Sequence, residues 1–161
     1  MSKPEFVYVT YIASTPEKVF EALTDTKMSE RYWHGNSVVS DWKVGSPFAL
    51  RLAYHDNDVT GEVLEYDPPR RLAYSFLAHD GSDGGKASRV TFELERQKDQ
   101  VKLTLVHDGF TPGSPVIGKI GVGWPLVLSS LKSYIECGKV MYAPWYEGLV
   151  EKAKMAVGAR R

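Results

Sequence analysis

Several short runs of the chain alternate apolar and polar residues, which is the pattern of half-buried β-strands. The first run, Phe6 to Ile12, is rich in β-forming residues. After Ser37 the period of two continues, and it is clearest at 90–95 and 101–105, on either side of a polar turn. Short turns between successive strands predict an antiparallel meander with one face toward solvent.

Two short helices are predicted between the first strand and the meander. Thr15 can cap the free amides of the first helix, Pro16 suits its first position, and Asp25 or Thr26 ends it. The second helix is expected around Lys27 to Trp33.

A longer amphipathic helix follows the meander. Its apolar stripe is Trp124, Val127, Leu128, Leu131, Tyr134 and Ile135. Pro125 leaves two alternatives, because the main helix either begins there or is a longer one from Pro115 that is kinked there. Gly138 ends the stripe. Residues 140–161 are expected to be a tail, in which Tyr142, Trp145, Leu149 and Val150 suit a short helix.

This order predicts an α+β fold in which a curved seven-stranded antiparallel sheet wraps around the long C-terminal helix. One helix is too narrow to cover the curved face, so a cavity between helix and sheet is expected. Inward-facing positions supply the candidate ligand-binding residues: Trp33, Phe48, Leu50, Tyr74, Phe76, Phe92, Leu94, Leu105, His107, Trp124, Leu128 and Leu131. The aromatic members can cradle a small apolar ligand, or they can simply fill the core.

Five segments in this order resemble the START-like or Bet v 1-like (SRPBCC) superfamily. They are Ser14–Asp25, Tyr32-Trp33, Gly61–Leu72, Leu105–Phe110 and Gly123-Trp124. The resemblance implies a helix-grip domain over residues 1–139 with a cavity. It leaves function open, because the superfamily holds lipid carriers, polyketide cyclases and hydrolases.

Within the superfamily, the chain is most similar to bacterial relatives of the C-terminal domain of the activator of the heat-shock protein 90 ATPase. The eukaryotic activator carries an additional N-terminal domain that has no counterpart in these 161 residues. Chaperone activation is therefore not expected from the resemblance alone, and a chaperone contact stays an alternative.

Composition narrows the classes of protein. Twenty basic and twenty acidic residues give a formal net charge of zero, which argues against a general nucleic-acid binder. The single cysteine, Cys137, excludes an intramolecular disulfide and a cysteine-based zinc site, and we expect it to be buried in packing. No apolar run is long enough for a membrane span, and a cytoplasmic location is expected.

His107 is the polar residue of most interest, since strand alternation points it inward. A neutral imidazole there can donate to a ligand or act as a general base. The alternative, which we favour, is a histidine that holds the turn before Gly109 or bonds a nearby carbonyl.

Other polar residues offer weaker candidates. His34, His55 and His79 lack the spacing of a metal site, and no metal or cofactor is expected. Glu62 and Glu65 lie three apart on a strand and are expected on opposite faces, which disfavours an acid and base pair. Arg70-Arg71 is interpreted as a solvated turn, with an anion site as the alternative.

The leading functional hypothesis is a non-enzymatic module that binds a small hydrophobic or aromatic molecule. The alternatives are a cyclase- or hydrolase-like enzyme in which His107 moves protons, and a protein that contacts a chaperone. A homodimer is a further possibility if the tail turns apolar residues outward.

Overall fold

The computed structural model describes residues 5–55, 57–79 and 84–142. The elements in these ranges are β1 (Phe6–Ile12), α1 (Pro16–Thr24), α2 (Thr26–Tyr32), β2 (Ser37–Ser40), β3 (Pro47–Arg51), β4 (Val59–Asp67), β5 (Arg71–Ala78), β6 (Ser88–Gln97), β7 (Gln100–Asp108) and α3 (Val116–Cys137). This order confirms the predicted α+β helix-grip fold.

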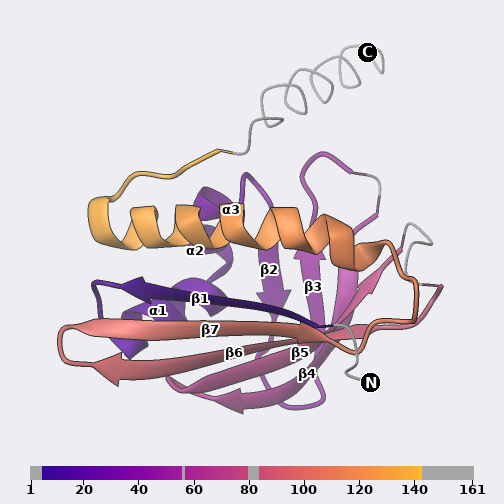
Figure 1. Ribbon diagram of the computed structural model, residues 1–161, viewed down its shortest axis with the longest axis horizontal. Helices are drawn as coiled ribbons and strands as arrows, with labels where there is room; N and C mark the ends of the chain where they lie inside the picture. The colour runs from indigo at the N-terminus through magenta and orange to yellow at the C-terminus, as the bar shows by residue number, and fades with distance from the viewer. Residues whose placement is uncertain (1–4, 56, 80–83, 143–161) are drawn as a thin grey trace.

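The seven strands form one antiparallel sheet in the order β1-β7-β6-β5-β4-β3-β2. The sheet curves, and α3 lies across one of its faces (Figure 1). On β7 the inward residues Val101, Leu103, Leu105 and His107 are all fully buried, whereas Lys102 between them is half-buried. The predicted alternation is therefore confirmed where the sheet meets the helix.

Local capping explains the two short helices. The Thr15 side chain accepts the amide of Lys18 at 3.3 Å, and Pro16 occupies the first turn of α1. Asp25 closes α1 and also caps α2, because its Oδ1 accepts the amide of Met28 at 2.8 Å. The second helix thus begins and ends one residue earlier than predicted.

Helix α3 is the longer of the two predicted alternatives, since it begins at Val116 and contains Pro125. The Ser114 hydroxyl accepts the amide of Val116 at 3.2 Å, and Gly138 ends the helix in the left-handed conformation with φ of 73°.

The C-terminal half of α3 is bonded to the end of β1. Glu136 Oε2 accepts the Ala13 amide at 2.7 Å and the Lys132 ammonium at 2.6 Å. Lys132 also donates to the carbonyl of Tyr11 at 2.7 Å. The Ala13 amide and Lys132 hold the pKa of Glu136 below its usual value. These bonds close the gap between edge strand β1 and α3.

Two sequence predictions are wrong. Glu62 and Glu65 do not lie on opposite faces, because a β-bulge between Val63 and Glu65 shifts the register and places Glu65 with Arg71 on the outer face. Cys137 is exposed rather than buried, because it lies in the last turn of α3, off the apolar stripe.

Most of the predicted tail, residues 143–161, lies outside the described residues, and so does the greater part of its expected short helix. None of the helices in the described ranges has the length and apolar character that crossing a bilayer requires.

Candidate functional site

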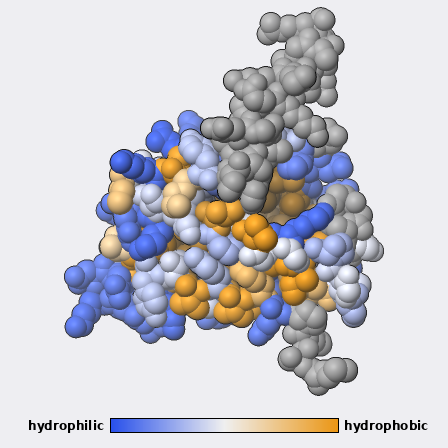
Figure 2. Space-filling model, turned by 45° about the horizontal axis from the view of Figure 1, so that its top comes forward, coloured by the Kyte–Doolittle hydropathy of each residue, from blue (hydrophilic) through white to orange (hydrophobic). Residues whose placement is uncertain are grey.

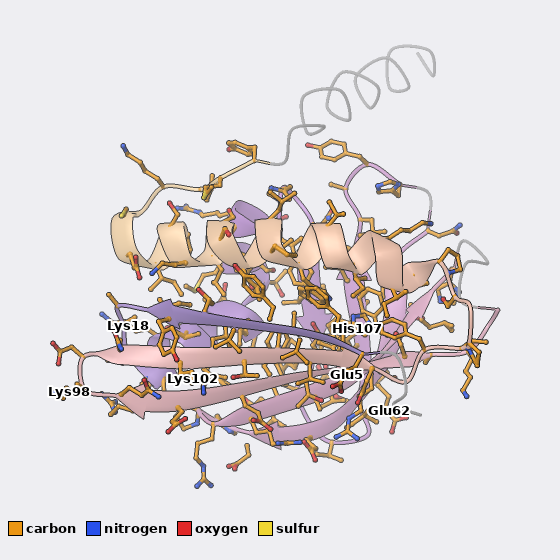
Figure 3. All side chains as sticks on the ribbon, viewed as in Figure 1. Glu5, Lys18, Glu62, Lys98, Lys102 and His107 are labelled. Atoms are coloured by element: carbon orange, nitrogen blue, oxygen red, sulfur yellow. The ribbon has the colours of Figure 1, made fainter. Side chains whose placement is uncertain are left out.

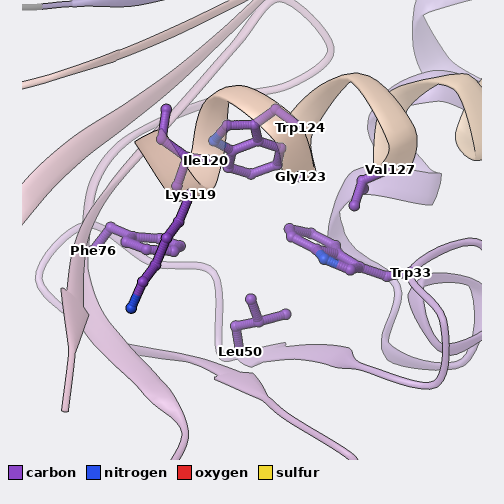
Figure 4. Close-up of a pocket in the computed structure, with 8 residues that line it drawn as sticks. All are labelled: Trp33, Leu50, Phe76, Lys119, Ile120, Gly123, Trp124 and Val127. Carbon is purple, nitrogen blue, oxygen red and sulfur yellow. The ribbon is translucent and has the colours of Figure 1, made fainter. Parts of the chain in front are cut away.

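An apolar chamber of about 150 Å³, here named the inner chamber, lies between α3 and the sheet. Trp33 enters from the end of α2, Leu50 from β3 and Phe76 from β5, and α3 supplies the remaining wall: Lys119, Ile120, Gly123, Trp124 and Val127. Figure 4 shows the rings of Trp33, Phe76 and Trp124 around a common space. The ring centroids of Trp33 and Trp124 are 5.2 Å apart. A chamber of this volume matches a single aromatic ring.

A second, more polar chamber of about 500 Å³, here named the outer chamber, adjoins the first. The two share Phe76, Lys119 and Ile120 as lining residues, so they meet at this point. The other residues that line the outer chamber are Leu52, His55, Asn57, Asp58, Val59, Ala78, His79 and Val116. In Figure 4 the Lys119 side chain passes Phe76 and carries its ammonium away from Trp33. The site therefore has an apolar inner end and a polar outer end.

Two polar residues that line the outer chamber, Asp58 and His79, form hydrogen bonds with neighbouring protein groups. Asp58 Oδ1 accepts the amide of Leu52 at 3.0 Å, which orders the segment that leads into β4. His79 Nε2 and Thr60 Oγ1 are 2.6 Å apart and form a hydrogen bond. These bonds leave a chamber wall whose hydrogen-bonding groups are positioned before a ligand arrives.

His107 lies on β7 under the N-terminal half of α3 (Figure 3) and is fully buried. The indole N–H of Trp124 donates to His107 Nδ1 at 3.0 Å. An indole nitrogen can only donate, so Nδ1 is the acceptor and the proton of the neutral ring is on Nε2. His107 Nε2–H then donates to Ser88 Oγ at 2.7 Å, and the Ser88 hydroxyl donates to the carbonyl of Phe76 at 3.1 Å.

Burial lowers the pKa of His107 to about 3, so the ring is neutral at physiological pH. Both nitrogens are engaged with protein groups, and His107 does not line either chamber. This arrangement supports the structural interpretation of the residue over the proton-transfer one. The partners are side chains of Ser88 and Trp124 rather than the expected turn or carbonyl.

Of the residues proposed from the sequence, Trp33, Leu50, Phe76 and Trp124 line the inner chamber. The others are buried and line neither chamber: Phe48, Tyr74, Phe92, Leu94, Leu105, His107, Leu128 and Leu131. Stacking explains part of this packing, since the centroids of Phe48 and Tyr74 are 3.8 Å apart. Phe92 also meets Trp124 edge-on at 5.9 Å.

Sequence reasoning missed Lys119, Ile120, Gly123 and Val127 as lining residues. The signal was present, because Ile120 and Val116 lie four and eight positions before Trp124. Extending the stripe backward from Trp124 would have brought the first two turns of α3 to the pocket.

The other candidate residues lie elsewhere. Arg70 pairs with Asp67 at 2.9 Å, and Arg71 bonds both Glu65 and Glu93 on the outer face. Burial lowers the pKa of His34, whose ring is 6.3 Å from that of Tyr142. Within the described ranges, no three histidine, cysteine or acidic residues are grouped as metal ligands.

Fold and site together define an α+β helix-grip protein with a pocket between its long helix and its curved sheet. The chain belongs to the family of activator of Hsp90 ATPase homolog 1-like proteins, which matches residues 13–136. This confirms the resemblance seen in the sequence. No curated protein matches the chain.

Solved structures with the same fold come from several organisms. A Mesorhizobium loti protein is 27% identical, with a TM-score of 0.73 over 82% of this chain and 96% of that one. The Aha1 dimer of Colwellia psychrerythraea is 21% identical, with a TM-score of 0.72 over 84% and 98% of the two chains. An HSP90 activator from Plasmodium falciparum is 23% identical, with a TM-score of 0.69 over 84% and 96%. The last two likenesses show the fold alone.

Proposed function

We propose that the protein binds a small amphipathic molecule without transforming it. The observation that carries this proposal is the junction of an aromatic chamber with a polar one at Phe76, Lys119 and Ile120. An apolar ring of the ligand occupies the space among Trp33, Phe76 and Trp124. A hydrogen-bonding group at its other end lies in the outer chamber. Small-molecule sites commonly combine an apolar lining with a few placed polar groups in this way.

Native mass spectrometry of protein purified from its own host tests the proposal, followed by denaturing extraction. We expect a discrete small molecule at stoichiometric level. A matched pair of variants locates its site: Gly123→Leu places a side chain in the inner chamber, and Gly118→Leu places the same side chain on the exposed part of α3. Retention of the molecule by Gly123→Leu as well as by Gly118→Leu would refute binding in this chamber.

A second candidate function is contact with another protein molecule, and the outer face of β1 favours it. Val7, Val9 and Tyr11 are 50%, 43% and 44% exposed there. Figure 2 shows hydrophobic side chains gathered on the side of the molecule where α3 and β1 lie. Such exposed apolar patches commonly mark contacts. We infer that a second copy of the chain pairs through this face.

Size-exclusion chromatography with light scattering tests the pairing. We expect a dimer that Val9→Glu converts to a monomer, whereas Val44→Glu, at a 68% exposed position between β2 and β3, leaves it unchanged. A monomeric wild-type protein would overturn the inference.

The same two variants test the chaperone alternative, because stimulation of the ATPase of added Hsp90 can be measured with each. Stimulation that Val9→Glu abolishes and Val44→Glu preserves would support a chaperone contact through β1. No stimulation by the wild-type protein would count against it.

A further inference from the structure

The two aromatic walls of the inner chamber come from different parts of the fold. Trp124 belongs to α3 and Phe76 to β5, and both line the chamber. Behind the chamber a buried chain of hydrogen bonds joins them. It runs from the Trp124 indole to His107, on to Ser88, and ends at the backbone carbonyl of Phe76.

Each link of this chain has one available direction. The indole has a donor and no acceptor, so the imidazole must accept at Nδ1 and donate at Nε2. The Ser88 hydroxyl oxygen accepts the hydrogen bond from Nε2–H, and its own O–H donates to the Phe76 carbonyl, which can only accept. Every polar atom in the chain is therefore satisfied, and rotation of the Trp124 ring would leave a buried donor and a buried acceptor without partners.

Ring contacts hold the imidazole itself. Phe76 meets the His107 ring edge-on, with centroids 5.0 Å apart and planes at 70°. Phe110 lies against the ring at 4.7 Å and 30°. His107 thus has a fixed plane, and through its Nδ1 it fixes the plane of the Trp124 indole.

We propose that His107 is a positioning residue of the pocket, which fixes the Trp124 ring as a flat wall and so makes the inner chamber selective for planar aromatic rings. This inference rests on the proposed function, since it concerns what the same chamber accepts. A fixed indole plane facing Trp33 and Phe76 admits a flat ring and excludes a puckered ring of the same carbon count.

The test compares the binding of two probes, toluene and methylcyclohexane, by proton and nitrogen NMR. The Trp124 indole N–H signal serves as the reporter, assigned by its absence in Trp124→Phe. In the wild-type protein we expect this signal to be protected from solvent exchange. We expect toluene to bind at least tenfold more tightly than methylcyclohexane.

Three variants examine the link. His107→Leu removes the acceptor, and we expect loss of the protected N–H signal and a selectivity ratio near one. His107→Asn keeps an acceptor oxygen close to the position of Nδ1, so we expect partial recovery of both. Trp124→Phe keeps an aromatic wall but has no N–H to anchor, and it covers the case in which His107→Leu does not fold. Its selectivity is also expected to fall.

The outcomes separate the two ideas. If the wild-type protein prefers toluene and the folded variants keep that preference in full, the positioning role is overturned while ligand binding stands. If toluene and methylcyclohexane bind the wild-type protein equally well, the positioning role is again overturned. If neither probe binds the wild-type protein, the proposed function falls and the selectivity falls with it.

Discussion

Glycine at position 123 of α3 keeps the inner chamber open, and replacing it has consequences that can be separated. A Cβ placed on Gly123 meets no heavy atom within 4 Å, and the same is true at Gly118 on the exposed side. Both residues are inside α3, but only Gly123 of the two lines the chamber. Gly118→Ala therefore reports the gain in helix propensity without a change in the pocket.

The expected magnitudes follow from this difference. Alanine in a helix interior is favoured over glycine by about 1 kcal/mol, so Gly123→Ala and Gly118→Ala should both raise the free energy of unfolding by up to that amount. Gly123→Leu should gain about 1–2 kcal/mol because it also fills an apolar cavity. In a chain of this length each kcal/mol corresponds to a melting temperature about 2–4 °C higher.

Urea unfolding and toluene titration measure the two effects on the same samples. Gly123→Leu should lose toluene binding while it gains stability, and Gly118→Leu should keep the wild-type affinity. If Gly123→Leu destabilises the protein, the space at this position is not free. If it binds toluene normally, the probe occupies another site, and the reasoning from the chamber is refuted.

Three further predictions concern stability. Gly61→Ala should cost more than about 3 kcal/mol in urea unfolding, because its Cβ would lie 1.8 Å from the carbonyl oxygen of Ser75; an effect as mild as that of Gly118→Ala would contradict the β4–β5 packing. Glu136→Gln should lower the free energy of unfolding by about 1 kcal/mol, because it weakens the bonds to Ala13 and Lys132; an unchanged urea midpoint at pH 7 would refute this. Below pH 6.5 the unfolded chain takes up a proton on His107 while the folded chain does not, since the folded pKa is about 3. As the pH is lowered from 6.5 toward 3, the free energy of unfolding should therefore decrease by up to about 1.4 kcal/mol per pH unit. The decrease should be less steep in His107→Asn, and an equal slope in the two proteins would disprove this.

The strands and the long helix were predictable because a period of two or 3.6 leaves one buried face. On β7 the alternation of Val101, Leu103 and Leu105 gives the inward set directly. The same logic, followed strictly, places Cys137 off the apolar stripe of α3, and the expectation of a buried thiol neglected it. The bulge between Val63 and Glu65 had no such signal, because it depends on how β4 meets β5.

The boundary between pocket and filled core was beyond a pattern of apolar positions. Phe48 and Phe76 are both inward-facing phenylalanines, yet Phe48 stacks on Tyr74 whereas Phe76 lines both chambers. The pattern of apolar positions predicts that a residue faces inward. Whether open space lies beside that residue depends on how completely the neighbouring side chains fill the volume around it. Gly123 is the instructive case, since a missing side chain contributes nothing to a hydrophobic pattern and still shapes the cavity.

His107 shows how hydrogen-bond accounting decides between chemical roles that the sequence leaves open. An inward histidine at the end of an apolar strand is compatible with a base or with a structural link. The indole of Trp124 removes the ambiguity, because a donor-only partner makes Nδ1 an acceptor and leaves the proton on Nε2. Because Ser88 Oγ accepts the hydrogen bond from Nε2–H, both ring nitrogens are bonded to protein side chains and neither is available to a substrate. The role that this geometry gives His107 is to hold the wall of the pocket in place.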